Sequence, residues 1–112
     1  MCLFCKIASK QIPSKVAFED DDLLAFHDIN PVAPTHILVI PKQHITSLGD
    51  ATTEHQALLG KLLLAARRAA EEAGLLEGGF RVVLNTGPNA GQSVFHVHLH
   101  VLGGRGMAWP PG

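Results

Sequence analysis

Three histidines alternate with apolar residues near the end of the chain, in the run His96-Val97-His98-Leu99-His100. On an extended strand successive side chains point to opposite faces, so the histidines share one face and the apolar residues share the other. An imidazole can ligate a metal ion or, in its neutral form, act as a nucleophile near pH 7. Neighbouring histidines on such a strand lie about 6.6 Å apart, which is too wide for one ion to gather all three. The spacing favours nucleophilic catalysis over a metallohydrolase that binds one ion with the whole triad.

A loop rich in glycine precedes these histidines, at residues 87–93, and ends in Gln92 and Ser93. Glycine lets backbone N–H groups turn toward an anion, and the last two residues add amide and hydroxyl donors. Taken alone, such a loop is more often a plain hairpin turn. Next to three histidines, it favours a site for a phosphate.

The only cysteines are Cys2 and Cys5. A single Cys-x-x-Cys pair does not close the long loops of a disulfide-stapled secreted domain, so it indicates metal binding or redox work instead. The N-terminal residues lack the basic stretch, the long apolar segment and the cleavage site of a secretory signal. We therefore expect a cytoplasmic protein.

The composition narrows the class of protein further. The chain has 112 residues, 46% of them hydrophobic, which predicts one domain over residues 1–112 with its own core. Lys and Arg total 9 against 10 Asp and Glu, so there is no excess positive charge to bind nucleic acid. The longest aliphatic run, residues 62–66, is far below the roughly 20 residues that cross a membrane.

Hydrophobic patterning predicts the elements that must position these residues. A short helix is expected within residues 2–9 and a long helix over residues 54–73, which begins at a capping box formed by Thr53 and Gln56 and ends at Gly74. The buried stripe of the long helix should hold Leu58, Leu62, Ala65, Ala69 and Ala73. Strands are expected at residues 15–19, 23–27, 36–40, 80–85 and 94–102, with the acidic run 19–22 as a solvated turn. This order predicts an α+β domain with a mainly antiparallel five-stranded sheet, one face of which the long helix covers.

The motifs together resemble those of a known family. The three histidines, with Gly91-Gln92-Ser93 just upstream, resemble the histidine triad (HIT) superfamily. Residues 25–36, the segment 39–42 and the tail 101–112, which ends in Trp-Pro-Pro-Gly, are similar to its Hint branch, the purine nucleoside phosphoramidases. The resemblance covers essentially the whole chain. It implies a HIT-like fold, a single HIT domain and a homodimer.

The resemblance also implies a reaction. His98 would attack the phosphorus of an adenosine 5′-phosphoramidate, and water would then hydrolyse the nucleotidyl-histidine intermediate to AMP, with no cofactor required for catalysis. The main-chain carbonyl of His96 would orient the nucleophile, and His36 would support the triad from a neighbouring strand. The phosphate would be held by donors from His100, Ser93, Gly91, Gln92 and Asn85, with Ser93 also placed to help protonate the departing amine.

A binding site for the nucleoside follows from the same resemblance. Asp28 corresponds to the acidic residue that binds the ribose. The purine would lie among apolar side chains that correspond to Leu3, Phe4, Ile7, Phe26 and Ile29, which from the sequence alone are ordinary core residues.

Some bacterial members of the family suggest a metal as well. The cysteine pair resembles theirs, which implies a structural zinc bound by Cys2, Cys5, His44 and His96, although a redox pair or two free thiols remain open. Two thiolates and two imidazoles leave a tetrahedral zinc no open position for a substrate. His27 and His55 receive no role and are expected to face solvent or to make local hydrogen bonds.

Two further expectations concern partners. Relatives form homodimers through the long helix and its neighbouring strand, and here Leu63, Leu64 and Ala70 fall off the predicted buried stripe and would supply that face, although burial within the monomer explains them equally well. The alternative to an enzyme is a regulatory module that binds AMP or another purine nucleotide with little turnover.

Overall fold

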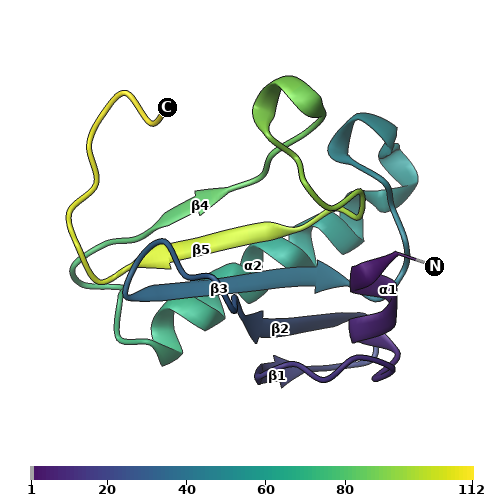
Figure 1. Ribbon diagram of the computed structural model, residues 1–112, viewed down its shortest axis with the longest axis horizontal. Helices are drawn as coiled ribbons and strands as arrows, with labels where there is room; N and C mark the ends of the chain where they lie inside the picture. The colour runs from purple at the N-terminus through teal and green to yellow at the C-terminus, as the bar shows by residue number, and fades with distance from the viewer. Residues whose placement is uncertain (1) are drawn as a thin grey trace.

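The computed structural model describes residues 2–112, in which one five-stranded sheet carries a helix on each face (Figure 1). The strand order is β1-β2-β3-β5-β4, and every neighbouring pair is antiparallel. The elements are α1 (Leu3–Ala8), β1 (Val16–Glu19), β2 (Leu23–His27), β3 (Thr35–Pro41), α2 (Gln56–Glu72), β4 (Arg81–Val83) and β5 (Leu99–Gly103). The predicted α+β class, the five antiparallel strands and the two helices are confirmed.

The long helix α2 starts differently from the sequence prediction. A 3₁₀ turn at Thr53–His55 precedes it, and the N-cap of that turn is Thr52. The side chain of Thr52 accepts from the N–H of Glu54, while Nδ1 of His55 accepts from the N–H of Thr52 at 2.9 Å. The predicted capping box at Thr53 and Gln56 is therefore wrong by one residue, because the 3₁₀ turn shifts the cap toward the N-terminus.

One face of α2 packs on the sheet through small side chains. Leu62, Ala65 and Ala69 are buried as predicted, and Ala70 is fully buried, whereas Ala73 is exposed. Of the two readings left open for Ala70, burial within the monomer is the one observed, since residues 62, 65, 66, 69 and 70 form one stripe at helical spacing. Alanines in this stripe let the helix axis lie close to the sheet. Leu63 and Leu64 remain exposed, at 58% and 70%.

The strands separate two apolar clusters by alternation. The cluster on the α2 side includes Val97, Leu99 and Val101, and the cluster on the α1 side includes Phe4 with Phe26. Since the apolar residues of the triad segment face α2, its histidines face α1. Figure 1 shows α1 lying across the ends of β2 and β3 on that face.

The strand that carries the triad is shorter than predicted. The pairing of β5 with β3 begins only at Leu99, because the N–H of Val97 donates to the carbonyl of Ile45 at 2.7 Å and the N–H of His96 bonds to Val94 at 2.9 Å. The backbone there turns before it joins the sheet. The alternation of side chains nevertheless continues through His96 and His98, so the predicted shared face is present.

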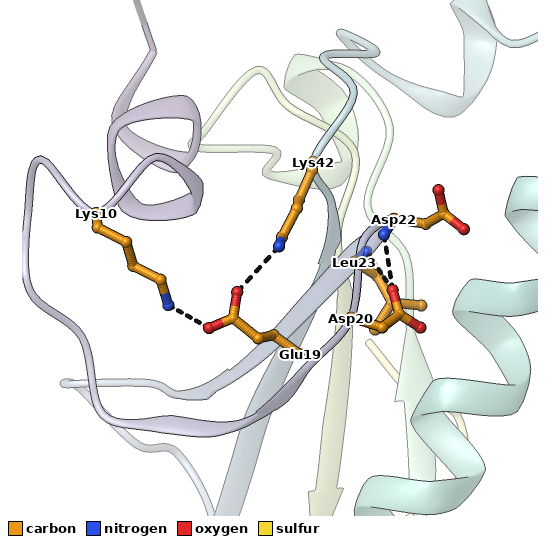
Figure 2. A network of polar contacts seen from close by, with 6 residues as sticks. All are labelled: Lys10, Glu19, Asp20, Asp22, Leu23 and Lys42. Carbon is orange, nitrogen blue, oxygen red and sulfur yellow. Dashed lines mark hydrogen bonds and ion pairs between the residues drawn. The ribbon is translucent and has the colours of Figure 1, made fainter.

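The acidic run forms the turn between β1 and β2 as expected. Oδ1 of Asp20 accepts from the N–H groups of Asp22 at 2.7 Å and of Leu23 at 3.0 Å (Figure 2). The N–H of Asp22 makes the largest contribution to lowering the pKa of the Asp20 carboxyl.

Over residues 2–112, neither helix has the length and apolar character needed to cross a membrane.

Candidate active site and metal centre

His98 has the geometry of an oriented nucleophile. Its Nδ1 lies 2.7 Å from the main-chain oxygen of His96, and only 5% of the residue is exposed. A carbonyl oxygen only accepts hydrogen bonds, so Nδ1 carries the proton and Nε2 keeps its lone pair. The edge-on ring of Phe4, 4.9 Å away between centroids, packs against the imidazole. The side chain is thus fixed in both tautomer and orientation.

The surroundings of His98 favour its neutral form. Burial lowers the pKa of the imidazole below its usual value, and it outweighs the opposing effects of the His96 carbonyl and the Asp28 carboxylate. A neutral imidazole is nucleophilic at Nε2 without a separate general base.

A second pair of histidines lies beside His98. Nε2 of His36 is 2.9 Å from Nδ1 of His100, and the N–H of Val32 donates to Nδ1 of His36 at 3.1 Å. Oδ2 of Asp28 lies 3.3 Å from Nε2 of His36. Burial, followed by the neighbouring His98 and His36, lowers the pKa of His100 to about 4, so its ring is neutral near pH 7.

Asp28, His36 and His100 are close enough to suggest a metal site, but their hydrogen bonds argue against it. Their potential ligand atoms lie within 4.8 Å of one another. A metal ion on Nε2 of His36 would force the proton onto Nδ1, directly opposite the N–H of Val32. Two donors would then face each other, so this cluster suits a chain of hydrogen bonds rather than an ion.

A cavity of about 480 Å³ opens beside these histidines, within the range of small-molecule sites. Most of the residues predicted for the substrate line it, from α1, β2, β3 and the start of β5. They are Leu3, Phe4, Ile7, Phe26, Asp28, Ile29, His36, Ser93, His98 and His100.

Other lining residues escaped the sequence analysis. They are Ile12, Pro13, Ser14, His27, Asn30, Val32, Leu38 and Val94. One signal was available for Leu38, because it pairs with Phe26 across β2 and β3 and so shares its face. No pattern in the sequence marks residues 12–14, which reach the cavity only because the chain reverses at Lys10, where φ is 67°.

The glycine-rich loop uses its donors differently from the prediction. The N–H of Gly91 donates to Pro88 and that of Gln92 to Gly87, both at 3.1 Å. The buried amide of Gln92 donates to the carbonyls of Thr46 and Val94 and accepts from the N–H of Gly87.

Of the loop residues expected at the phosphate, only Ser93 therefore lines the cavity. Asn85, Gly91 and Gln92 do not. Because every N–H of the Gln92 amide group and of its backbone is engaged with the protein, this residue shapes the loop instead of donating to a ligand.

Two cysteines and two histidines converge at the N-terminal end of α1. Sγ of Cys2 and of Cys5 lie 3.3 to 3.6 Å from Nδ1 of His44 and of His96, and the two Nδ1 atoms are 3.1 Å apart. A tetrahedral zinc bound at about 2.3 Å to sulfur and 2.0 Å to nitrogen spaces its ligands about 3.3 to 3.8 Å apart. The donor set and its spacing fit such an ion.

The hydrogen bonds around this cluster are compatible with a bound metal, since the N–H of Cys5 donates to Sγ of Cys2 at 3.2 Å, a bond that a thiolate accepts while it ligates. Nε2 of His96 donates to the carbonyl of Pro41 at 2.8 Å, which directs the lone pair of Nδ1 toward the sulfurs.

Beyond Pro41, Lys42 pairs with Glu19 at 3.0 Å, and Glu19 also pairs with Lys10 at 2.6 Å (Figure 2). The two lysines lower the pKa of Glu19. This network ties the segment after α1 to the end of β3.

The two histidines without an expected role lie outside the triad. His55 makes the local hydrogen bond at the start of the long helix, in keeping with the expectation. His27 ends β2 half-buried, and its main-chain N–H donates to Lys15.

Comparison with known proteins gives one consistent result. Residues 9–107 match the family model described as the HIT domain. The chain is 54% identical over 112 residues to the adenylylsulfatase HINT1 of Arabidopsis thaliana, covering 98% of this chain and 76% of that protein. It is also 54% identical to the 14 kDa zinc-binding protein of Zea mays, covering 98% and 87%. The crystal structure of a HIT family hydrolase from Legionella pneumophila superposes with a TM-score of 0.98 at 52% identity, over 100% of both chains.

Proposed function

Because this chain belongs to the HIT domain family, whose hydrolases it resembles over its whole length, we propose that it is a purine nucleoside phosphoramidase. It hydrolyses adenosine 5′-phosphoramidates to AMP through a nucleotidyl-histidine intermediate. The observation that carries the proposal is His98, a buried imidazole with its proton held at Nδ1 and its Nε2 free beside a nucleotide-sized cavity.

The cavity suits a nucleoside at its apolar end. Leu3, Phe4 and Ile7 from α1 and Phe26 from β2 form one apolar wall, in which the rings of Phe4 and Phe26 pack edge to face at 5.7 Å, and a flat base can lie against this wall. The carboxylate of Asp28 lies between this wall and the histidines, where it can accept from the ribose hydroxyls. The phosphate then falls at His98.

The chemistry proceeds in two displacements. Nε2 of His98 attacks the phosphorus, the phosphorus–nitrogen bond breaks, and the amine leaves with the hydroxyl proton of Ser93, which the attacking water restores to Ser93 in the second displacement. The His96 carbonyl holds the Nδ1 proton of the cationic phosphoryl-imidazole. His100 donates to the phosphoryl oxygens, where charge grows. Water then attacks phosphorus, His98 is released with its lone pair, and AMP departs.

A second leaving group follows from the Arabidopsis relative, which is named as an adenylylsulfatase. Adenosine 5′-phosphosulfate presents the same phosphorus to the same nucleophile, but sulfate leaves as a stable anion. Departure of an amine requires a proton, whereas departure of sulfate does not. Replacing Ser93 with Ala should therefore slow the phosphoramidate reaction more than the phosphosulfate reaction, and equal slowing would remove Ser93 from proton delivery.

The test of the proposal combines turnover and trapping. We expect release of amine and AMP from an adenosine 5′-phosphoramidate carrying a fluorescent amine, and an acid-labile, base-stable adenylyl adduct on His98 after rapid quenching. Tight binding of AMP without turnover of the phosphoramidate or the phosphosulfate would favour a regulatory nucleotide-binding module instead. An adduct on any other residue would overturn the assignment of the nucleophile.

We also propose that Cys2, Cys5, His44 and His96 hold a structural zinc. The ligand spacing supports this, as does the name of the maize relative. When bound, the ion supplies a rigid crosslink between α1 and the segment before β5, and four protein ligands leave it no position for substrate. The two thiols must stay reduced, which suits a cytoplasmic protein.

We also propose that the chain forms a homodimer. Leu63 and Leu64 form an exposed apolar face on α2, and β4 is an edge strand of the sheet. We expect a dimer by light scattering. Leu64→Glu should shift it toward monomer, while Leu48→Glu, at another exposed leucine, should not; a monomeric wild-type chain would contradict this part.

A further inference from the structure

We propose that Arg105 is a positioning residue for this reaction, because it holds the loop that sets the tautomer of His36 and thereby the donor that His100 presents to the phosphate. The inference rests on the proposed function for the identity of that phosphate. Arg105 itself is exposed, in the turn after β5, and does not line the cavity.

The tautomers of the two histidines follow from their partners. The N–H of Val32 can only donate, so Nδ1 of His36 accepts and the proton of the neutral ring resides on Nε2. That Nε2–H donates to Nδ1 of His100 at 2.9 Å. The proton of His100 must then reside on its own Nε2, where the ring lines the cavity. The N–H of Val32 at Nδ1 of His36, together with the Asp28 carboxylate 3.3 Å from its Nε2, thus makes His100 a hydrogen-bond donor at the site.

The turn after β5 holds the Val32 loop at two points. Nη2 of Arg105 donates to the carbonyl of Val32 at 3.1 Å, on the same residue whose N–H contacts His36. The neighbouring Gly104, at φ of 90°, lies so close to Pro34 that an added Cβ would meet its ring carbon at 2.8 Å. Val32 is 61% exposed, so these contacts, and not burial of its side chain, fix the position of its backbone.

Loss of this support would reverse the hydrogen bonds. Without the Val32 N–H in place, only the Asp28 carboxylate, 3.3 Å from Nε2 of His36, still favours a proton on that atom. A fraction of the His36 rings then carries the proton on Nδ1 and accepts from Nδ1–H of His100. Nε2 of His100 then offers a lone pair to the phosphoryl oxygens instead of a proton. A donor aimed at developing negative charge becomes an acceptor, which opposes the transition state far more than it opposes binding of the substrate.

The experiment reads the tautomers directly. In ¹⁵N-labelled wild-type protein, long-range proton–nitrogen spectra should show Nδ1 unprotonated and Nε2 protonated in His36 and in His100. Arg105→Ala should give mixed tautomers at both rings and lower kcat about 10-fold, with KM changed less than about twofold. Arg105→Lys keeps one donor within reach of the Val32 carbonyl and should restore most of both readouts.

Arg81→Ala is the matched control, because Nη2 of Arg81 also donates to a carbonyl of the C-terminal segment, that of Ala108 at 2.9 Å, without contact to the His36 loop. It should leave the tautomers of wild type. Unchanged tautomers in Arg105→Ala would overturn the proposal. If that variant does not fold, Gly104→Ala, which displaces the same loop through Pro34, decides by the same spectra. If the wild-type protein does not turn over the phosphoramidate, the proposed function is refuted. The role of Arg105 in setting the tautomers is still tested, because the spectra are recorded without substrate.

Discussion

The main-chain oxygen of His96 lies 2.7 Å from Nδ1 of His98, so the group that orients the nucleophile belongs to the backbone, two residues away. Many histidine nucleophiles and bases rely on a carboxylate side chain for this purpose. Here the alternation of one short segment supplies both the nucleophile and its orienting acceptor, and a substitution at position 96 cannot remove the acceptor.

Removal of the nucleophile should abolish turnover. We expect His98→Ala to lower kcat on an adenosine 5′-phosphoramidate by at least about 10³-fold, because it removes the Nε2 lone pair that forms the covalent intermediate in the proposed mechanism. Binding of AMP, measured by calorimetry, should change much less. The matched control is His55→Gln, since glutamine at that position can accept the same hydrogen bond from Thr52. Near-normal turnover by His98→Ala would refute the mechanism.

Removal of a metal ligand should lower the stability of the fold more than it lowers the rate of the reaction. Elemental analysis of the wild type is expected to give one zinc per chain, and Cys5→Ser should lower both the zinc content and the thermal midpoint. Ser9→Ala, which removes a hydroxyl just beyond α1, is the control and should keep the zinc. A wild-type chain without zinc after mild purification would contradict the site.

The half-buried histidine His100 should make stability depend on pH. Its pKa is about 4 when folded, against the ordinary value of 6.5, so the unfolded chain takes up a proton that the folded chain resists. The stability it contributes is complete above about pH 6.5 and is lost as the pH falls toward about 4, by about 3 kcal/mol at most. Urea unfolding at pH values between 6.5 and 4 should show that the free energy of unfolding falls less steeply with pH in His100→Asn than in the wild type. An equally steep loss would show that His100 does not titrate this way.

Replacing Gly103 and Gly60 with alanine should have opposite effects on the stability of the fold. A Cβ at Gly103 would meet three side-chain atoms of the buried Leu75, the nearest at 2.5 Å, so Gly103→Ala should destabilise the fold by about 1 to 3 kcal/mol. Gly60 lies inside α2 with nothing within 4 Å, so Gly60→Ala should stabilise it by about 0.5 to 1 kcal/mol. Chemical denaturation of both variants measures the difference, and equal effects would contradict this account.

The alternation of side chains made most of the fold predictable from the sequence. It identified the strands and the two faces of the triad segment, because period-two patterning survives even where His96 and His98 precede the paired part of β5. It did not predict the late start of β5, since the N–H of Val97 bonds to Ile45, a residue 52 positions earlier that no local pattern identifies. The burial of Ala70 likewise depends on how α2 is rotated against the sheet.

The site was predictable to the extent that it lies on strands. His36, His98 and His100 meet because antiparallel pairing brings β3 beside β5, with His36 opposite Leu102. The loop was not predictable in the same way. Whether Gln92 donates to a phosphate or to the carbonyl of Thr46 depends on a contact between segments 46 residues apart, and the structure has the second.

The cluster of Cys2 and His96 has a consequence for how the chain folds. Their ligand atoms meet although the two residues are 94 positions apart, so this contact closes almost the entire chain into one loop. During synthesis it cannot form until His96 has emerged, so the four-residue cluster at α1, which carries one wall of the cavity, stays incomplete until then. Contacts of such long range are made late. We therefore expect the sheet and α2 to assemble first, with the nucleotide cavity the last part of the molecule to gain its final shape.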